Sequence, residues 1–248
     1  MNGEGDGRDT RAAVNAIRDG AEGLGILLSD EELERYRLYL ETLQEWNQRM
    51  NLTAARDPLE LAVKHFLDSL TCFLVTAADT PLRVLDVGTG AGFPGVVLKI
   101  HAPQWHLTLL DSTRKKVAFL EHLVGLLGLQ QTDTLHARAE EAGRLPAYRE
   151  RFDLVVARAV AELRVLAEWC LPFVRVGGLF VAMKGPRGDE EAPAAKSAVA
   201  QLGGEIEQVK PLVLPFGAGE RRLVLVRKRR PTPRAFPRAA GAAARRPL

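Results

Sequence analysis

Residues 82–95, LRVLDVGTGAGFPG, decide the fold of this chain. Residues 83–87 form a short β-rich run, and four glycines follow within eight residues, before the helix-compatible stretch VVLKI. This order predicts a strand, a tight turn and a helix. Because glycine has no Cβ, the turn can adopt positive φ values and let a ligand contact backbone N–H groups at the start of the helix. The segment therefore predicts a ligand-binding turn.

An acid further along the chain complements this turn. The apolar run of residues 106–110 ends at Asp111, which follows Gly88 by 23 residues. An acid at the end of a second strand is placed to accept hydrogen bonds from the two hydroxyl groups of a ribose. The spacing indicates a site for an adenosine-containing ligand.

The glycine pattern leaves two cofactor classes open. Gly90, Gly92 and Gly95 fit the G-x-G-x-x-G pattern of nicotinamide enzymes. Asp86 and Gly88 bring the segment closer to the D-x-G-x-G-x-G loop of S-adenosylmethionine (AdoMet) methyltransferases. A tight turn without any ligand is the third interpretation, and the spaced acid argues against it.

Composition limits the class of protein. The chain has 248 residues, of which 46% are apolar, enough for a full core in one domain with appendages. Cys72 and Cys170 lie in apolar stretches without C-x-x-C spacing, so we expect neither a disulfide framework nor a metal site. No apolar run reaches 18 residues, and the N-terminus is unlike a signal peptide. These features predict a soluble cytoplasmic protein.

The net charge of +3 is unevenly distributed along the chain. No acid follows Glu220, whereas ten Lys and Arg residues do; without those ten, 24 basic residues face 31 acidic ones, a net charge of −7. An arginine-rich end on an acidic body favours a phosphate-rich partner, because guanidinium groups match phosphate oxygens. The alternative is a disordered, solubilising tail.

The pattern of the chain predicts three regions. Residues 1–80 are expected to form a helical appendage, residues 81–230 the cofactor-binding domain, and residues 231–248 a basic tail. Residues 1–10 look disordered because they offer nothing to bury. Three glycines weaken a helix expected over residues 11–28.

Two further helices are expected in the appendage. Ser29 and Glu32 form a capping box at the start of a helix that ends near Met50. The amide-rich residues after it, including Asn51, indicate a ligand-facing loop. A helix over residues 59–76 places His65 and Asp68 on one side. A buried histidine held by an aspartate is favoured over a catalytic pair.

From residue 82 onward, strands alternate with helices, which predicts a parallel, doubly wound α/β sheet. A helix over residues 189–203 precedes two closely connected strands, which predict a hairpin with an antiparallel last strand and seven strands in all. No residues remain for the second half of a dehydrogenase. Further strands are expected at residues 106–111, 132–136, 152–157, 179–185, 205–214 and 221–227.

Charged residues follow two of these strands. Arg158 comes directly after the fourth strand, and Lys184 lies at the end of the fifth. Ligands of such sheets bind beyond the carboxyl ends of the strands. Arg158 and Lys184 are therefore the candidates for positioning a substrate.

Eight stretches in the same order resemble the GidB, or RsmG, family of bacterial 16S rRNA guanine-N7 methyltransferases. The resemblance covers nearly the whole chain after about Leu33. Its motifs are NLTAARDP, KHFLDSL, VGTGAGFPG, LLDSTRKKVAFL, VVARAVAEL, VAMKG, GERRLVLVRK and the tail FPRAAGAAARRPL. Many family members have tyrosine and, further on, lysine where this chain has Phe236 and Ala239.

The resemblance implies the fold of a class I AdoMet methyltransferase, Rossmann-like with an N-terminal helical appendage. It implies methyl transfer to N7 of a guanosine in the decoding region of 16S rRNA, with the rRNA, the 30S subunit or an assembly intermediate as the substrate. A monomer is the default expectation for the oligomeric state. Together with the glycine motif, it suggests these cofactor contacts: Asp86, Gly88, Gly90, Gly92, Phe93, Asp111, Ser112, Thr113, Ala139, Glu140 and Arg158. Candidates for RNA contacts are Asn51, Arg56, Arg221, Arg222, Arg234 and Arg238.

The absence of two catalytic motifs agrees with the chemistry of this reaction. Guanine N7 has an in-plane lone pair and no proton, so it attacks a sulfonium methyl group without a general base. The chain has no [ND]-P-P-[YF] motif after the fourth strand and no cysteine nucleophile in that loop. Positioning should supply the acceleration. A small-molecule methyltransferase and an AdoMet-binding regulatory protein stay open, and a dehydrogenase is more remote.

Overall fold

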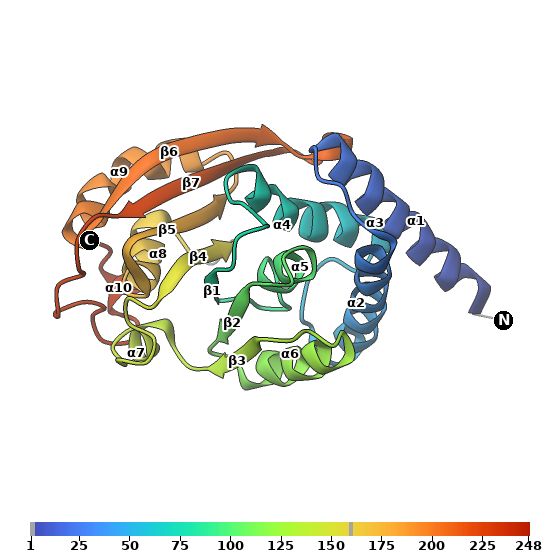
Figure 1. Cartoon of the computed structure of the whole chain (residues 1–248), viewed down its shortest axis with the longest axis horizontal. Coiled ribbons are helices and arrows are strands. Elements are labelled where there is room, and N and C mark those ends of the chain that lie inside the picture. The colour runs from blue at the N-terminus through green and yellow to red at the C-terminus, as the bar shows by residue number, and fades with distance from the viewer. Residues whose placement is uncertain (1–2, 159–160) are drawn as a thin grey trace.

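The computed structural model describes residues 3–158 and 161–248, the first six as backbone only, and contains one seven-stranded sheet (Figure 1). The strand order is β3-β2-β1-β4-β5-β7-β6. Strands β1 to β5 pair in parallel, and β7 runs antiparallel to both β5 and β6. The strands are β1 (Arg83–Val87), β2 (His106–Asp111), β3 (Thr132–His136), β4 (Phe152–Arg158), β5 (Val174–Lys184), β6 (Gly204–Val213) and β7 (Glu220–Lys228). The predicted seven-stranded, mostly parallel sheet with an antiparallel last strand is confirmed.

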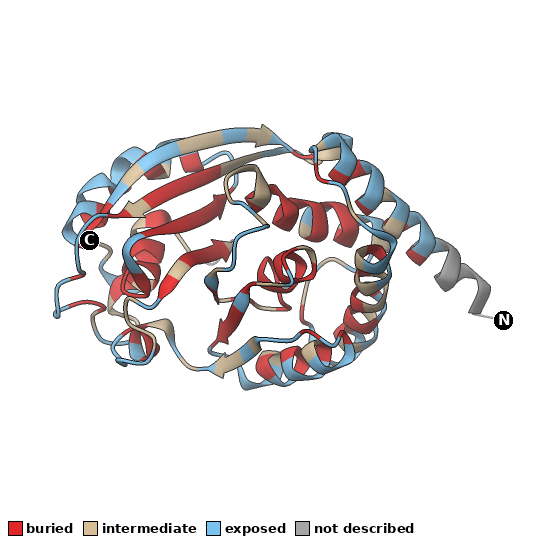
Figure 2. Cartoon of the chain, viewed as in Figure 1, coloured by how far each residue is buried: buried red, intermediate tan, exposed pale blue. Residues whose placement is uncertain are grey.

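Alternate strand residues pack into two hydrophobic layers, one on each face of the sheet: Val84 enters one layer and Leu85 the other. Figure 2 shows that the central strands are largely buried. The first layer is covered by α1 (Gly3–Gly23), α2 (Asp30–Met50), the helical run 58–74, α5 (Gly95–His101) and α6 (Arg114–Leu126), and the second by α7 (Ala139–Ala142), α8 (Leu163–Cys170) and α9 (Gly188–Gln201). In the described part of the chain, no helix has the length and apolar character needed to cross a bilayer.

The N-terminal helices differ in detail from expectation. The capping box is confirmed, since Glu32 N donates to Ser29 Oγ at 3.3 Å and Ser29 N donates to Glu32 Oε2 at 2.7 Å. The expectation of disorder is wrong for residues 3–10, which belong to α1. The run 58–74 comprises α3 (Pro58–Leu61), the π-helical turn η1 (Ala62–Leu67), α4 (Asp68–Leu70) and the 3₁₀ turn η2 (Thr71–Leu74). The π turn interrupts the single helix that periodicity predicts.

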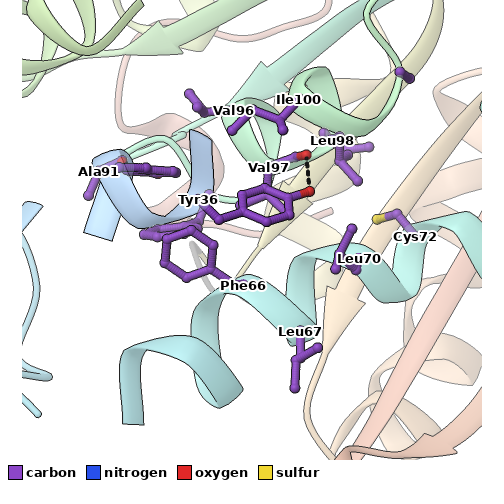
Figure 3. Packing of buried hydrophobic residues seen from close by; sticks show 14 of the residues in the cluster. Tyr36, Phe66, Leu67, Leu70, Cys72, Ala91, Val96, Val97, Leu98 and Ile100 are labelled. Atoms are coloured by element: carbon purple, nitrogen blue, oxygen red, sulfur yellow. Dashed lines mark hydrogen bonds between the residues drawn. The ribbon is translucent and has the colours of Figure 1, made fainter. Parts of the chain in front are cut away.

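Helix α2 supports the glycine turn from the first layer. Tyr36 is completely buried and donates to the carbonyl of Val97 in α5 at 3.1 Å (Figure 3). Tyr39, one turn further along α2, donates to the carbonyl of Ala91 within the glycine turn at 2.5 Å. Its ring stacks on Phe93 with a centroid distance of 5.1 Å. The helical appendage thus holds the turn that carries the candidate site.

The C-terminal residues pack against the body rather than forming a disordered tail. Thr232, Phe236 and Ala243 are all buried, and a last short helix, α10 (Ala242–Arg245), contacts α8. Phe236 belongs to the hydrophobic layer of α8 and α9. The alternative of a disordered tail is therefore wrong.

Most of the C-terminal positive charge is matched by acids of the same chain. Six of the ten basic residues after Glu220 lie within 4.0 Å of a carboxylate among the described residues: Arg221, Arg222, Arg227, Lys228, Arg229 and Arg238. Their partners come from earlier parts of the chain or, for Glu220, from the start of β7. Much of the positive charge at the end of the sequence is thus paired within the folded chain.

Candidate functional site

The glycine turn joins β1 to α5 in a conformation that larger residues do not adopt easily. Gly88, Gly90 and Gly92 have φ values of 70°, 63° and 99°. A Cβ at Gly92 would lie 2.6 Å from the hydroxyl of Tyr39 and 2.8 Å from Cγ2 of Val96. The predicted strand–turn–helix is confirmed, and the tight packing explains why the turn needs glycine.

Asp86 lies beneath this turn and stabilises it. Its side chain is completely buried, and Oδ2 accepts a hydrogen bond from Gly95 N at 2.8 Å. Burial raises the pKa of this carboxyl to about 6. Asp86 does not line the cavity beside Asp111, so it supports the turn rather than contacting a ligand in that cavity.

Asp111 connects the end of β2 to the turn. Val87 pairs with Leu110 in the sheet register, which brings the ends of β1 and β2 together. Asp111 Oδ2 accepts a hydrogen bond from Gly90 N at 3.0 Å, and Oδ1 accepts one from Thr113 N at 2.8 Å. Each carboxylate oxygen retains a further lone pair for a ligand hydroxyl.

A cavity of about 280 Å³ opens beside Asp111; we call it the Asp111 pocket. Five residues expected to contact the cofactor line it together: Gly88, Asp111, Ser112, Ala139 and Glu140. The pocket also contains residues that sequence reasoning missed: Val87, Leu110, Ala137, Arg138, Trp169, Gly241 and Ala244. No local sequence signal marks Gly241 or Ala244, because they reach the pocket only through the path of the folded tail.

A second cavity, of about 330 Å³, lies beyond the ends of β4 and β5; we call it the Arg158 cavity. It is lined by Lys64, His65, Asp68, Arg158, Met183, Lys184, Gly185 and Arg221. The two candidates for substrate positioning, Arg158 and Lys184, therefore share one cavity, as their strand ends suggested. The appendage contributes Lys64, His65 and Asp68 to the lining of this cavity.

Arg158 is the centre of the hydrogen bonds around this cavity. Its guanidinium donates to Asp68 Oδ2 at 3.1 Å and to the Lys64 carbonyl at 2.8 Å. It also lies over the ring of Phe93, 5.2 Å from the centroid, which links the cavity to the glycine turn. Asp68 Oδ1 accepts a second hydrogen bond, from Arg221 Nε at 3.1 Å. On the appendage side, the π turn η1 contributes Lys64 and His65, and α4 contributes Asp68.

His65 is held between Arg158 and the loop after α2. Arg158 can only donate, so its 2.9 Å contact makes Nδ1 of His65 the acceptor, and Nε2 then donates to Thr53 Oγ1 at 3.0 Å. Burial, followed by the charge of Arg158, lowers the pKa of His65 to about 3. The ring stacks on Phe93 with a centroid distance of 4.9 Å. His65, which is neutral, and the side chain of Asp68 thus both contact Arg158 rather than pairing with each other.

The low pKa of His65 predicts a specific loss of stability in acid. The unfolded chain binds a proton near the ordinary pKa of 6.5, whereas the folded protein resists it until about pH 3. The contribution of His65 to the free energy of unfolding is therefore complete above pH 6.5 and falls as the pH approaches 3. Asp86 acts in the opposite sense, because its raised pKa contributes stability at low pH that is lost as the pH rises through about 6.

We expect His65→Gln to lose less stability than the wild type between pH 6.5 and 4, because glutamine keeps an acceptor and does not titrate. Urea unfolding at stepped pH measures this slope. Exposed His106→Gln is the matched control and should follow the wild type. Equal slopes for the wild type and His65→Gln would contradict the assignment.

The predicted positioning residue Lys184 also has an internal partner. Its ammonium group lies 2.8 Å from Glu191 Oε2 and donates to the Ala161 carbonyl at 2.7 Å. The side chain is 9% exposed at the cavity wall. Lys184 therefore reaches a ligand only as part of an ion pair.

The six residues expected to contact RNA fall into two groups. Three are engaged in ion pairs: Arg221 with Asp68, Arg222 with Asp189 and Glu220, and Arg238 with Glu168. The other three are exposed: Asn51, Arg56 and Arg234. Asn51 ends α2 with a left-handed φ of 49°, and Arg56 lines a shallow cavity of about 210 Å³ with Gln44 and Gln48.

Comparison with known sequences adds a family resemblance to this geometry. Residues 32–224 match the GidB family model, described as rRNA small subunit methyltransferase G. A ribosomal RNA small subunit methyltransferase G of Symbiobacterium thermophilum is 51% identical over 245 residues, which cover 97% of this chain and 100% of the relative. The corresponding protein of Pelotomaculum thermopropionicum is 47% identical, with 95% and 98% of the two chains covered.

Solved structures of low sequence identity share the fold. Fibrillarin of Aeropyrum pernix, crystallised with natively bound AdoMet, superposes with a TM-score of 0.50 at 14% identity, covering 64% of this chain and 72% of its own. The YcgJ protein of Bacillus subtilis gives a TM-score of 0.51 at 16% identity, covering 67% and 100%. The predicted Rossmann-like α/β fold is thereby confirmed.

Proposed function

The chain belongs to the rRNA small subunit methyltransferase G family, and from this premise we propose that it methylates N7 of a guanosine in the decoding region of 16S rRNA. AdoMet is the methyl donor and S-adenosylhomocysteine the second product. The observation that carries the proposal is the presence of two cavities at the carboxyl ends of the strands, one containing Asp111 and the other Arg158. The Asp111 pocket suits a nucleoside cofactor, and the Arg158 cavity suits a polyanionic substrate.

The residues of the Asp111 pocket fit the adenosine part of AdoMet. Asp111 offers carboxylate oxygens to the ribose hydroxyls, and Glu140 offers a second carboxylate. Val87, Leu110 and Ala137 provide apolar surface for a purine. When bound, AdoMet supplies an electrophilic methyl group on a sulfonium. Phe93 of the glycine turn and Arg158, whose guanidinium lies over the ring of Phe93, are proposed to contact the methionine part.

The Arg158 cavity is proposed to receive the guanosine. Guanine N7 needs no general base, and neutral His65, with its pKa of about 3 and its ring nitrogens engaged, is suited to orienting Arg158 rather than to accepting a proton. Arg158, Lys184 and Arg221 can hold a phosphate or the guanine O6. Catalysis then rests on the alignment of N7, methyl and sulfur in a site with little water.

RNA binding is proposed to use polar and basic side chains of the appendage, β7 and the tail. N7 lies in the major groove, which is deep and narrow in A-form RNA, so the target is an unstacked or flipped guanosine. The proposed contacts are Asn51, Arg56, Arg221, Arg222, Arg234 and Arg238. Arg221, Arg222 and Arg238 would contact RNA while paired with acidic side chains of the chain. Arg56 and Arg234 are exposed. The proposed setting is a cytoplasmic monomer acting on 16S rRNA, the 30S subunit or an assembly intermediate.

Transfer of tritium from methyl-labelled AdoMet to 16S rRNA and to 30S particles tests this function. Nuclease digestion and nucleoside mass spectrometry then identify the product. We expect 7-methylguanosine. Label on another atom would refute the base-free mechanism, and AdoMet binding without any labelled RNA would refute the proposed substrate.

A further inference from the structure

The C-terminal segment reaches back across the molecule to the Asp111 pocket. Gly241 and Ala244 line this cavity together with Gly88, Asp111 and Glu140. The two tail residues lie about one hundred positions after Glu140 in the sequence. The pocket is therefore closed on one side by the last residues of the chain.

Two arginines of the body hold the backbone that leads to this wall. The guanidinium of Arg149 donates to the carbonyls of Phe236 at 2.8 Å and Thr232 at 2.7 Å. Arg144 Nε donates to the Pro237 carbonyl at 2.9 Å. These contacts satisfy carbonyl groups of residues 232–237, which form no strand or helix, so this stretch follows one defined path.

A buried ion pair fixes the segment where it turns toward the pocket. Glu168 of α8 is completely buried and accepts hydrogen bonds from three nitrogens of Arg238: the backbone N at 2.8 Å, Nε at 2.9 and 3.0 Å to the two carboxylate oxygens, and Nη2 at 2.6 Å. The same Nη2 donates to the Arg246 carbonyl at 2.8 Å. Because a buried carboxylate requires a cation and donors, this pair favours the docked tail. It also joins the two ends of the segment that contains α10.

A second contact joins the tail to a residue of the pocket itself. Gly241 N donates to Glu140 Oε1 at 2.8 Å. Ala243 is buried against the body, whereas its neighbour Ala244 is exposed and lines the cavity. Glu140 is thus shared between the tail and the proposed cofactor site.

We propose that residues 238–245 form a wall of the AdoMet pocket, held closed by the Glu168–Arg238 and Glu140–Gly241 contacts, and that this closure increases affinity for the cofactor. The inference rests on the proposed location of AdoMet in the Asp111 pocket. It assigns Gly241 and Ala244 as cofactor-contacting residues and Arg238 as a positioning residue that acts through the tail.

The wall is tested directly by placing a bulky side chain on it. Ala244→Phe fills the cavity from the tail side and should raise the Kd for AdoMet and S-adenosylhomocysteine by about tenfold or more in calorimetric titrations. Ala240→Phe is the matched control, since Ala240 is an exposed alanine of the same segment that does not line the cavity. Both variants should unfold near the wild-type temperature without ligand.

The ion pair is tested by hydrogen exchange with mass spectrometry on the full chain. AdoMet should slow exchange of the amides of Gly241, Arg245 and Arg246 in the wild type. Glu168→Gln should exchange faster over residues 238–246 and bind AdoMet more weakly, whereas the control Arg230→Gln should match the wild type. Arg230 donates to the Ala200 carbonyl and lies outside the segment.

Asp111→Asn in the same titrations separates this inference from the proposed function. Weak binding by Asp111→Asn with wild-type binding by both Ala244→Phe and Glu168→Gln would overturn the wall and leave the cofactor site standing. Wild-type binding by all three variants would overturn the wall together with the proposed location of AdoMet. Weak binding by Asp111→Asn, Ala244→Phe and Glu168→Gln, with normal binding by the two controls, supports the wall.

Discussion

Replacement of Asp111 by asparagine is expected to raise the Kd for AdoMet by roughly a hundredfold. Asparagine has nearly the same shape as aspartate but carries no charge. Hydrogen bonds to an ionised acceptor contribute about 1.5–3 kcal/mol each, and the amide offers one acceptor oxygen in place of two. One oxygen of Asp111 also accepts from Gly90 N and the other from Thr113 N, so asparagine leaves one of these donors unsatisfied. Calorimetric titration with AdoMet measures the loss.

The backbone contacts of Asp111 require a measurement of stability beside that of affinity. Loss of one N–H acceptor should lower the free energy of unfolding by about 1–3 kcal/mol, which urea unfolding without ligand detects. Asp133→Asn is the matched control, because Asp133 lies on neighbouring β3 with its side chain exposed. A variant with lowered stability and an unchanged Kd would show that Asp111 supports the turn without contacting the ribose.

Replacement of Arg158 is expected to reduce kcat/KM for methyl transfer to RNA by roughly a hundredfold to a thousandfold, because this side chain holds the network that lines the Arg158 cavity and contacts Phe93 of the glycine turn. Arg158→Ala leaves the buried Asp68 with Arg221 as its remaining arginine partner in the described network and removes the cation from the face of Phe93. Arg158→Lys keeps the charge but offers one point of donation in place of a planar fork. It should therefore recover only a small part of the rate.

Single-turnover methylation of 16S rRNA, with the Kd for AdoMet measured in parallel, tests this expectation. Arg175→Ala is the matched control, since Arg175 pairs with Asp153 at 2.6 Å at the opposite end of β4 and β5. Full activity of Arg158→Lys would show that charge alone suffices. Unchanged activity and affinity of Arg158→Ala would remove it from the site.

Much of the site could be predicted because its signals are local. The four glycines and Asp111 identified the turn and the end of the neighbouring strand, and parallel pairing then places Gly88, Asp111 and Ser112 in one pocket. Arg158 and Lys184 were found because carboxyl ends of parallel strands meet at one edge. The path of the tail had no comparable signal: its glycine and alanines carry no chemistry until folding brings them to Glu140.

The sequence by itself determined the alternation of strands and helices, the capping box at Ser29, the glycine turn and the family, because each depends on residues close together in the chain or on motif order. Only the tertiary structure decided which charges meet. Arg221 with Asp68 and Arg238 with Glu168 join residues 153 and 70 positions apart. Ion pairing and burial depend on distances in space, which spacing along the chain does not set. For that reason the sequence did not show that the arginine-rich end packs against the folded body. It also did not show that burial and the charge of Arg158 keep His65 neutral.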